Sequence, residues 1–400
     1  MQLAFRRYES DDQPQVEEIW SLSFFGGSPL PDFVPFCADG QSVFVAEDVA
    51  EPGRILAAYK LHHLTAWRGS SYVDGADDDR DGVYLTNDGV GLVGVRPEVR
   101  QTGVGGKLLR WGLAEMRGRG THFSSLYAFS EAYYRRLGWE STGTRVQIFC
   151  PNKRMPRLKV NLPVRQLTAD QWPLLEAAYD RFARRYCGMS RRSQVRWDRV
   201  LRPKDPNDPV IYALGDPVES YVVLNANRAG WNDQTIVEFV WTSVESYRSA
   251  LGFLANLGIN QRSLVWQEPS DGPFRYTHHD KTVEQHLIPP PQFRIVDVPG
   301  AIGALRTNAS GEFRFQLSDE QLPENDGPWR VAFSPAGVNV TPCDEADLHF
   351  SVQTLTQAVL GEPSLATLVA RGYVRSHSES ATAAATALLT EQRVYCLEIF

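Results

Sequence analysis

Apolar residues in the first 150 positions follow two spacings, one typical of strands and one typical of helices. Short apolar runs bounded by Gly, Pro or charged residues predict strands, whereas apolar positions three or four residues apart predict helices. The strands are expected at 3–7, 42–47, 55–67, 90–95, 123–129 and 146–150, and the helices end near 21, 117 and 137. This alternation predicts one α/β domain at the start of the chain.

A second pattern of the same kind follows the segment 151–163, which is rich in Pro, Lys and Arg and is expected to be a linker. A helix is expected at 167–186, and the strand–helix–strand order of the first domain then recurs. The strands are expected at 210–214, 221–225, 236–242 and 262–266, with a helix at 247–257. The turn at 242–246 contains no glycine, so this duplicate is expected to lack the glycine turn that the first domain has at 103–106.

Three consecutive prolines at 289–291 mark a second boundary. The last segment predicts strands at 313–317, 329–333 and 337–340 and helices at 351–360, 364–371 and 381–390. Its final residues, 393–400, are mostly apolar, whereas most chain ends are polar and frayed. We therefore expect a strand that is packed as far as Phe400. An acidic run at 74–81 is expected to be an exposed loop.

Composition narrows the class of protein. The formal net charge of -7 argues against wholesale binding to nucleic acid, and the hydrophobic content of 42% is ordinary for a globular protein. No window approaches the roughly 18 consecutive apolar residues of a membrane span, and Arg6, Arg7 and Glu9 interrupt any signal peptide. The five cysteines are scattered, and neighbours such as His62 and His63 on a strand point to opposite faces, so no metal site is expected. These features predict a cytoplasmic protein with no membrane or nucleic-acid partner.

The segment 93–108 carries the clearest chemistry. The strand at 90–95 leads into a turn with Gly103 and Gly105, which opens a helix. Glycine lets backbone N–H groups approach an anion closely, and the helix N-terminus adds unpaired donors and a partial positive charge. Arg100 supplies a charge-assisted donor. Together these features suit a pyrophosphate.

Two better-known glycine motifs do not fit this turn. A Walker loop, Gly-x-x-x-x-Gly-Lys-Ser/Thr, would need glycine in place of Gln101 and a hydroxyl residue in place of Leu108. A dinucleotide fingerprint, Gly-x-Gly-x-x-Gly, would need a third glycine where Leu108 stands. A glycine turn that binds no ligand stays an alternative.

The run Arg100-Gln101-Thr102-Gly103-Val104-Gly105 matches the pattern Arg/Gln-x-x-Gly-x-Gly/Ala. Placed after a strand, it resembles the acetyl-CoA signature of the GNAT acetyltransferase superfamily. The resemblance implies an N-acetyltransferase that uses acetyl-CoA as co-substrate and needs no metal. The residues that it assigns to acetyl-CoA are Val93, Gly94, Val95, Arg100, Gln101, Thr102, Gly103, Val104, Gly105 and Gly106.

A tyrosine at the family's usual spacing adds to this resemblance. In Tyr134-Arg135-Arg136-Leu137-Gly138-Trp139 the order of Tyr, an apolar residue, Gly and an aromatic residue matches the family pattern. GNAT enzymes commonly use this tyrosine to protonate the departing CoA thiolate, so the resemblance makes Tyr134 the general acid. An ordinary pKa of ~10 keeps a tyrosine protonated at neutral pH. Tyr133 is the neighbouring candidate, and a tyrosine with a packed ring and a wet hydroxyl is the structural alternative.

The order of the three segments resembles the Eis (enhanced intracellular survival) family. Its members join an active GNAT domain, a GNAT-like domain without a cofactor site and a sterol-carrier-like domain. The resemblance implies an α/β (α+β) fold: two tandem GNAT-like domains, at 1–155 and 156–290, followed by a sterol-carrier-protein-like α/β domain at 291–400. It also implies a homo-oligomer, often a hexamer. The α-carboxylate of Phe400 would serve as a base or relay, with anchoring of a sheet as the alternative.

The resemblance places a primary-amine acceptor near Phe24 and Phe25, with Tyr127 as a further active-site residue. Aminoglycoside-modifying members are acidic at the penultimate position, where this chain has Ile399 and carries Glu398 one residue earlier. On a strand this shift turns the carboxylate to the opposite face, which argues against polycationic antibiotic substrates. A non-catalytic protein that binds CoA as a sensor or scaffold is the alternative function.

Overall fold

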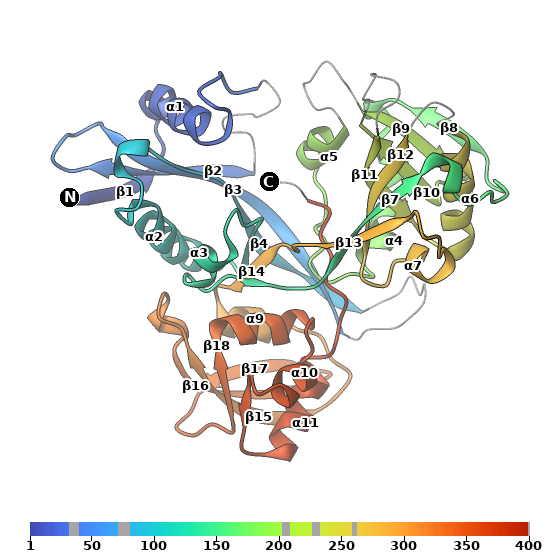
Figure 1. The fold of residues 1–400 in the computed structure, drawn as a ribbon. Helices are drawn as coiled ribbons and strands as arrows, with labels where there is room; N and C mark the ends of the chain where they lie inside the picture. Colours follow the sequence, from blue (N-terminus) through green and yellow to red (C-terminus); the bar gives the residue numbers. More distant parts are fainter. Residues whose placement is uncertain (32–39, 71–80, 202–208, 226–232, 258–261, 399–400) are drawn as a thin grey trace.

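The computed structural model describes residues 1–31, 40–70, 81–201, 209–225, 233–257 and 262–398. Two α/β lobes lie side by side and a third lobe lies below them, as Figure 1 shows. Within the described residues each lobe is built on its own sheet. The last described residues run back from the third lobe into the space between the first two (Figure 1). The three lobes therefore meet around the C-terminal segment.

The first lobe is built on a mixed sheet. Its first four strands are antiparallel neighbours, and β5 lies parallel to β4. The strand order is β1-β2-β3-β4-β5-β14-β6. The strands are Leu3–Arg7 (β1), Gln41–Asp48 (β2), Ile55–Gly69 (β3), Gly82–Val95 (β4), Phe123–Leu126 (β5), Gln292–Ile295 (β14) and Glu140–Ser141 (β6).

Helices cover both faces of this sheet. The helix α1 (Gln13–Phe24) buries Trp20 in an apolar cluster with Val43 of β2. The helix α2 (Val104–Gly118) belongs to a second cluster that contains Phe44. Because neighbouring residues of a strand point to opposite faces, Val43 and Phe44 place the two helices on opposite sides of the sheet. The short helix α3 follows β5. It spans Glu131–Arg135.

The second lobe repeats a strand–helix–strand unit. The strand β11 (Gln234–Trp241), the helix α6 (Val244–Leu257) and the strand β12 (Ser263–Pro269) follow one another, and the two strands pair in parallel. The order of the sheet is β13-β7-β12-β11-β10-β9-β8. The remaining elements are Glu284–Ile288 (β13), Arg145–Pro151 (β7), Ser220–Leu224 (β10), Val210–Leu214 (β9), Val164–Leu167 (β8), Pro173–Ala183 (α4), Gln194–Leu201 (α5) and Phe274–Thr277 (α7).

The first two lobes exchange strands. The strand β7 precedes the boundary expected at 155, yet it pairs with β12 and β13 of the second lobe. In return β14, which follows the boundary expected at 290, pairs with β5 and β6 of the first lobe. The far end of β3 also bonds to the second lobe, where the Trp67 amide donates to the Met189 carbonyl at 2.7 Å. The two lobes cannot separate without opening both sheets.

The third lobe joins the first through buried charge. Arg294 of β14 and Asp319 form an ion pair at 2.7 Å, and both side chains are fully buried. The third sheet has the order β17-β16-β15-β18-β19. Its elements are Gly311–Ser318 (β15), Gly327–Ser334 (β16), Gly337–Pro342 (β17), Leu348–Ser351 (β18), Arg375–Ser376 (β19), Val298–Gly303 (α8), Val352–Leu360 (α9), Leu365–Ala370 (α10) and Glu379–Leu388 (α11). No helix in the described ranges is long and apolar enough to cross a membrane.

Most expected elements are present, with changed bounds. The strand expected at 90–95 begins at Gly82, and the helix expected at 167–186 begins only at Pro173. A capping box between Thr168 and Gln171 forms a separate turn there, and the proline then occupies the start of the helix. The acidic loop expected at 74–81 lies, except for Asp81, outside the described residues.

The C-terminal segment 391–398 is extended but is not the strand that its apolar pattern predicted. It forms one isolated bridge, from Val394 to Cys187. Its backbone also bonds to a side chain: the Val394 amide donates to the Glu362 carboxylate at 2.7 Å. No strand edge lies beside this segment within the described residues, so its backbone bonds go to a loop and a side chain instead of a ladder.

We expect Phe293→Ala to lower the free energy of unfolding by about 3–5 kcal/mol, because a cavity would open where the three lobes meet. Phe293 is fully buried on β14 and shares a cluster with Phe123, Cys187 and Val352. Chemical denaturation followed by tryptophan fluorescence measures the change. The control is Leu287→Ala, at a strand position that is 75% exposed, and it should change little. An unshifted midpoint for Phe293→Ala would show that β14 does not hold the lobes together.

Candidate active site

The strands β4 and β5 separate at the centre of the first sheet. They pair in parallel from Asn87 and Phe123 to Val90 and Leu126, where β5 ends while β4 continues to Val95. Beyond Val90, in the part of the chain that the structure describes, the outer edge of β4 has no strand partner. Its backbone groups are therefore open to a ligand.

A bulge accompanies this separation. Ala58 of β3 pairs with Gly94, and Lys60 pairs with Gly91, so that Leu92 and Val93 together face one residue of β3. Leu92 has a φ of 51°, in the left-handed region. A bulge bends its strand and increases the local twist. The bulge thus turns the end of β4 away from the line of the sheet. This end carries Val93, Gly94 and Val95, which the family resemblance assigned to acetyl-CoA.

The glycine turn follows directly and opens α2. Gly103 has a φ of 87°, and a Cβ added there would have nothing within 4 Å, so the turn is open. The helix begins at Val104 and its first amides have no acceptor within the helix. A Cβ on Gly105 would lie 3.1 Å from Val95 Cγ2 and 3.2 Å from the Tyr133 hydroxyl. The amides of the turn and the open edge of β4 therefore adjoin one another, which suits an extended anionic ligand.

The corresponding turn in the second lobe is closed by side chains. The Ser246 hydroxyl accepts from the amides of Thr242 and Ser243 at 3.1 and 3.0 Å. The Ser243 hydroxyl accepts from the Ser246 amide at 3.1 Å. These bonds use donors that would otherwise be available to a phosphate. This turn without glycine thus leads into a helix whose first amides are hydrogen-bonded within the chain.

Tyr133 and Tyr134 lie beside the glycine turn in different environments. Tyr134 is 3% exposed and contacts Trp139 edge to face, with ring centroids 6.2 Å apart. Burial raises the pKa of its phenol above the ordinary value of 10.0. Among the described residues its hydroxyl has no hydrogen-bond partner. Tyr133 is half-buried, and its hydroxyl is the atom next to Gly105. Tyr134 therefore keeps its hydroxyl protonated, whereas Tyr133 is the tyrosine that borders the glycine turn.

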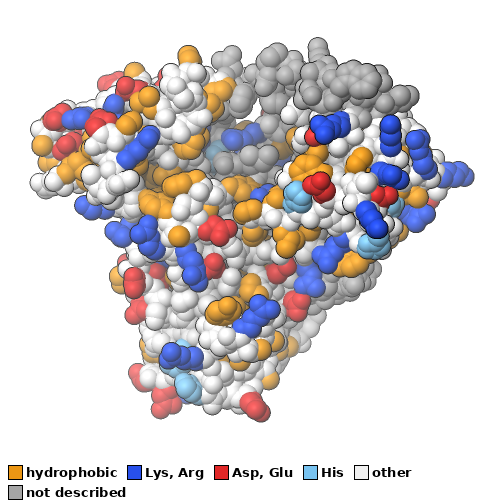
Figure 2. All heavy atoms as spheres, in the orientation of Figure 1, with side chains coloured by type: hydrophobic (Ala, Val, Ile, Leu, Met, Phe, Trp, Pro, Cys, Tyr) orange, Lys and Arg blue, Asp and Glu red, His pale blue; other side chains and the backbone are white. Residues whose placement is uncertain are grey.

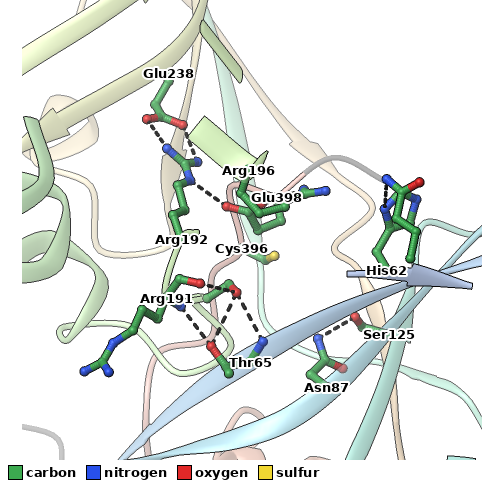
Figure 3. Close-up of polar contacts among 12 residues, drawn as sticks. His62, Thr65, Asn87, Ser125, Arg191, Arg192, Arg196, Glu238, Cys396 and Glu398 are labelled. Atoms are coloured by element: carbon green, nitrogen blue, oxygen red, sulfur yellow. Dashed lines mark hydrogen bonds and ion pairs between the residues drawn. The ribbon is translucent and has the colours of Figure 1, made fainter. Parts of the chain in front are cut away.

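Polar side chains line the opposite face of the same sheet, the face that carries α1. His62, Asn87, Ser125 and Tyr127 come from β3, from β4 and from β5 and its continuation, at positions that register and alternation place on one face. Figure 3 shows His62, Asn87 and Ser125 turned to this side. The Asn87 amide donates to the Ser125 hydroxyl at 2.8 Å, while the buried Asn87 Oδ1 has no hydrogen-bond partner among the described residues. Figure 2 shows the surface recessed between the two upper lobes.

The C-terminal segment lies over this face. The Tyr127 hydroxyl donates to the Cys396 carbonyl at 3.4 Å, and Cys396 itself is 4% exposed. In Figure 3 the Cys396 thiol lies between His62 and the arginines of the second lobe. We call the space bounded by His62, Asn87, Ser125 and Cys396 the α1-side chamber.

Glu398 anchors this segment in the second lobe. Its carboxylate is fully buried and accepts from Arg192 Nε and Arg196 Nε, both at 2.7 Å. Arg192 also forms a paired contact with Glu238, at 2.7 and 2.6 Å (Figure 3). Burial by itself would raise the pKa of Glu398, but the charges of Arg196 and Arg192 outweigh it and hold the pKa at about 2. Glu398 is therefore ionised and fixed.

The site residues predicted from the sequence do not all lie together. Phe24 and Phe25 lie at the C-terminal end of α1, whose Ile19 and Ser23 pack over Gly94, and Phe24 is 46% exposed. Phe400 lies outside the described residues. We call the point where β4 and β5 separate the fork. The fork and the glycine turn carry Val93, Gly94, Val95, Arg100, Gln101, Thr102, Gly103, Val104, Gly105 and Gly106. Tyr134 of α3 lies in the same apolar cluster as Val104.

Sequence reasoning missed the α1-side chamber. His62, Asn87, Ser125 and Cys396 come from separate elements, and no spacing in the chain links them. No group of three His, Cys, Asp or Glu residues in the described ranges could hold a metal ion. The one available signal was the polar character of Asn87 and Ser125 inside strands that are otherwise buried and apolar.

Comparison with protein families accounts for all three lobes. Residues 4–142 match an acetyltransferase (GNAT) domain, and residues 188–295 match a second acetyltransferase (GNAT) domain. Residues 298–397 match a sterol carrier protein domain. The chain thus contains two GNAT domains followed by a sterol carrier protein domain.

Relatives match most or all of the chain at low sequence identity. An uncharacterized N-acetyltransferase of Streptomyces coelicolor is 27% identical over 331 residues, covering 76% of this chain and 78% of that protein. The structure of Eis1 from Mycobacterium abscessus matches with a TM-score of 0.77 at 22% identity and covers 100% of both chains. A probable N-acyltransferase from Enterococcus faecalis matches with a TM-score of 0.87 at 17% identity, again over 100% of both chains. These structures share the fold of the whole chain.

We expect Glu398→Gln to lower the free energy of unfolding by about 3–5 kcal/mol at neutral pH, because Arg192 and Arg196 would lose the charge that compensates them. The ordinary pKa of 4.5 falls to about 2 in the folded protein, so this stabilisation is present above pH 4.5 and is lost as the pH falls toward 2. Denaturant midpoints measured from neutral pH down to pH 3 follow the loss.

The matched control is Glu391→Gln on the same segment. Glu391 pairs with Arg393 at 2.6 Å, but its side chain is 53% exposed, so its removal should change stability little. Equal effects of the two substitutions, or a Glu398→Gln protein as sensitive to acid as the unchanged chain, would contradict the anchoring role.

Proposed function

Because this chain is a GNAT-superfamily protein with two acetyltransferase domains and a sterol carrier protein domain, we propose that its first domain transfers an acetyl group from acetyl-CoA to a primary amine. The amine attacks directly while both substrates are bound. One observation carries the proposal: the open edge of β4 and the glycine turn adjoin one another in the first lobe, whereas serine side chains close the second turn. The first lobe is therefore the catalytic one.

Acetyl-CoA would lie along the fork. The first amides of α2 and the guanidinium of Arg100 would bind the pyrophosphate, because both present N–H donors where the positive end of the helix dipole lies. Arg100 Nε already donates to the Val95 carbonyl at 3.1 Å, which holds the side chain beside the end of β4. The backbone of 92–95 would bind the pantetheine arm as a neighbouring strand would.

Acetyl-CoA supplies the activated acetyl group as a thioester. Holding the amine against the thioester carbonyl converts a bimolecular reaction into one within a complex, which supplies much of the acceleration. A backbone N–H at the end of β4 would stabilise the charge that develops on the carbonyl oxygen. As the new C–N bond forms and the C–S bond breaks, Tyr134 would give its proton to the departing thiolate. The raised pKa of Tyr134 keeps that proton in place until the sulfur becomes basic.

The amine must lose a proton in the same reaction. The proposed acceptor is the carboxylate of Phe400, a role that rests on the resemblance to Eis proteins. Glu398 stands two residues before it in the sequence and is anchored by Arg192 and Arg196. That anchoring supports the proposal, because a base must be held within hydrogen-bond reach of the proton that it removes. Adding one glycine after Phe400 should lower kcat and leave acetyl-CoA binding intact.

We expect Tyr134→Phe to lower kcat by about a hundredfold or more, with little change in the affinity for acetyl-CoA, since only the proton donor is removed. Release of the CoA thiol measures turnover, and calorimetric titration measures binding. The neighbouring substitution Tyr133→Phe serves as the comparison and should change the KM for acetyl-CoA more than kcat. If Tyr133→Phe carries the loss of kcat instead, the two tyrosines exchange roles.

We expect Gly105→Ala to weaken acetyl-CoA binding by about ten- to a hundredfold, because the added methyl group would press on Val95 and Tyr133 and hold the ligand away from the amides. Gly118→Ala is the matched control: it lies at the other end of α2 with nothing within 4 Å of its Cβ position. Titration with acetyl-CoA compares the two. Equal affinities would show that the glycine turn does not hold the ligand.

The proposal as a whole is tested with acetyl-CoA and a panel of amines. Thiol release with one class of amine establishes catalysis and names the acceptor group. Binding of acetyl-CoA without release across the panel would favour a CoA sensor or scaffold. Absence of binding would overturn both.

A further inference from the structure

Three arginines of the second lobe approach the α1-side chamber, and two of them are neutralised there. Arg192 and Arg196 bind Glu398, and Arg192 also binds Glu238. Arg199 follows Arg196 by three residues on α5, so both side chains lie on the same side of the helix. Among the residues that the structure describes, Arg199 forms no ion pair or hydrogen bond, although it is half-buried.

The chamber wall opposite Arg199 adds positive charge. His62 is 2% exposed on β3, and Lys60, two residues earlier on the same face, is 1% exposed and lies 5.2 Å from the centroid of the Trp20 ring. Burial lowers the pKa of His62 well below its ordinary value, and the charges of Arg199, Arg196 and Lys60 lower it further.

Among the described groups, the carboxylates of Glu238 and Glu398 pair with Arg192 and Arg196 and not with Arg199. At a partly buried site the positive charge of Arg199 attracts anions and repels cations more strongly than it would in bulk water. The guanidinium of Arg199 also has the planar set of donors that binds carboxylate or phosphate oxygens in pairs.

We propose that the acceptor amine of this enzyme also carries an anionic group, a carboxylate or a phosphate, and that Arg199 binds this group in the α1-side chamber. The inference rests on the proposed acetyltransferase function and specifies its substrate class. The anionic end of the acceptor lies toward α5, and its amine lies toward the fork between β4 and β5. Asn87 Oδ1, which is buried and has no hydrogen-bond partner within the described ranges, faces the same chamber as a hydrogen-bond acceptor.

The test compares amines in pairs that differ in the anionic group. The pairs are tyrosine with tyramine, lysine with cadaverine, and phosphoethanolamine with ethanolamine, and kanamycin represents polycations. We expect kcat/KM, measured by release of the CoA thiol, to favour the anionic member of at least one pair by about ten- to a hundredfold. The amino acid pairs and the phosphate pair distinguish a carboxylate from a phosphate.

Substitutions at Arg199 connect the preference to this residue. Arg199→Gln should abolish the preference for the anionic member, mainly through KM, and Arg199→Lys should restore part of it because the charge returns. The matched control is Arg191→Gln. Arg191 lies against the Tyr84 ring at 4.8 Å, is exposed, and in Figure 3 points away from the Glu398 cluster. This control should leave the preference unchanged.

A binding measurement makes the result independent of turnover. Calorimetry on the CoA-bound protein compares the acetylated products of each pair, such as N-acetyltyrosine and N-acetyltyramine, and the anionic product should bind more tightly. The proposal is overturned if the neutral or cationic member reacts equally well or better, if the preference survives Arg199→Gln, or if acetyl-CoA binds while no anionic member reacts or binds as product. Failure of acetyl-CoA to bind would instead overturn the proposed function itself.

Discussion

The buried charge of Glu398 is the constraint on which the central part of this molecule depends. A carboxylate that is fully removed from water must be paired, and both of its arginine partners belong to the second lobe. The C-terminal segment therefore cannot leave the space between the first two lobes without exposing three buried charges to a new environment. Because the Tyr127 hydroxyl holds the same segment from the first lobe, the chamber between the lobes has a fixed wall.

The strand exchange acts on the same boundary. The strand β7 belongs to the first lobe by sequence and to the second by pairing, while β14 is placed the opposite way. A surface between two domains that merely touch would permit movement, but two exchanged strands place backbone hydrogen bonds across the boundary. The two GNAT domains thus form one body, and residues from both can build one site.

The two GNAT domains show one structural unit with two kinds of helix start. Both have a strand, a helix and a parallel strand, and both leave amides at the start of the helix. In the first domain glycines keep these amides open, whereas in the second Ser243 and Ser246 satisfy them from within the chain. The sheet of the first domain then separates two kinds of chemistry. Its edge and the α2 face present backbone donors, and its α1 face adjoins the α1-side chamber.

The sequence by itself determined the local features of this protein. The glycine turn, the strand before it and the position of Tyr134 follow from residues close together in the chain, because backbone conformation at Gly103 and the start of a helix are local properties. The apolar periodicity also predicted most of the helices and strands. Only the tertiary structure decided that β7 and β14 exchange lobes, since strand pairing depends on which edges meet. It likewise decided that the helix carrying Arg196 and Arg199 meets Glu398 of the C-terminal segment, because contacts between segments far apart in the chain leave no spacing in the sequence.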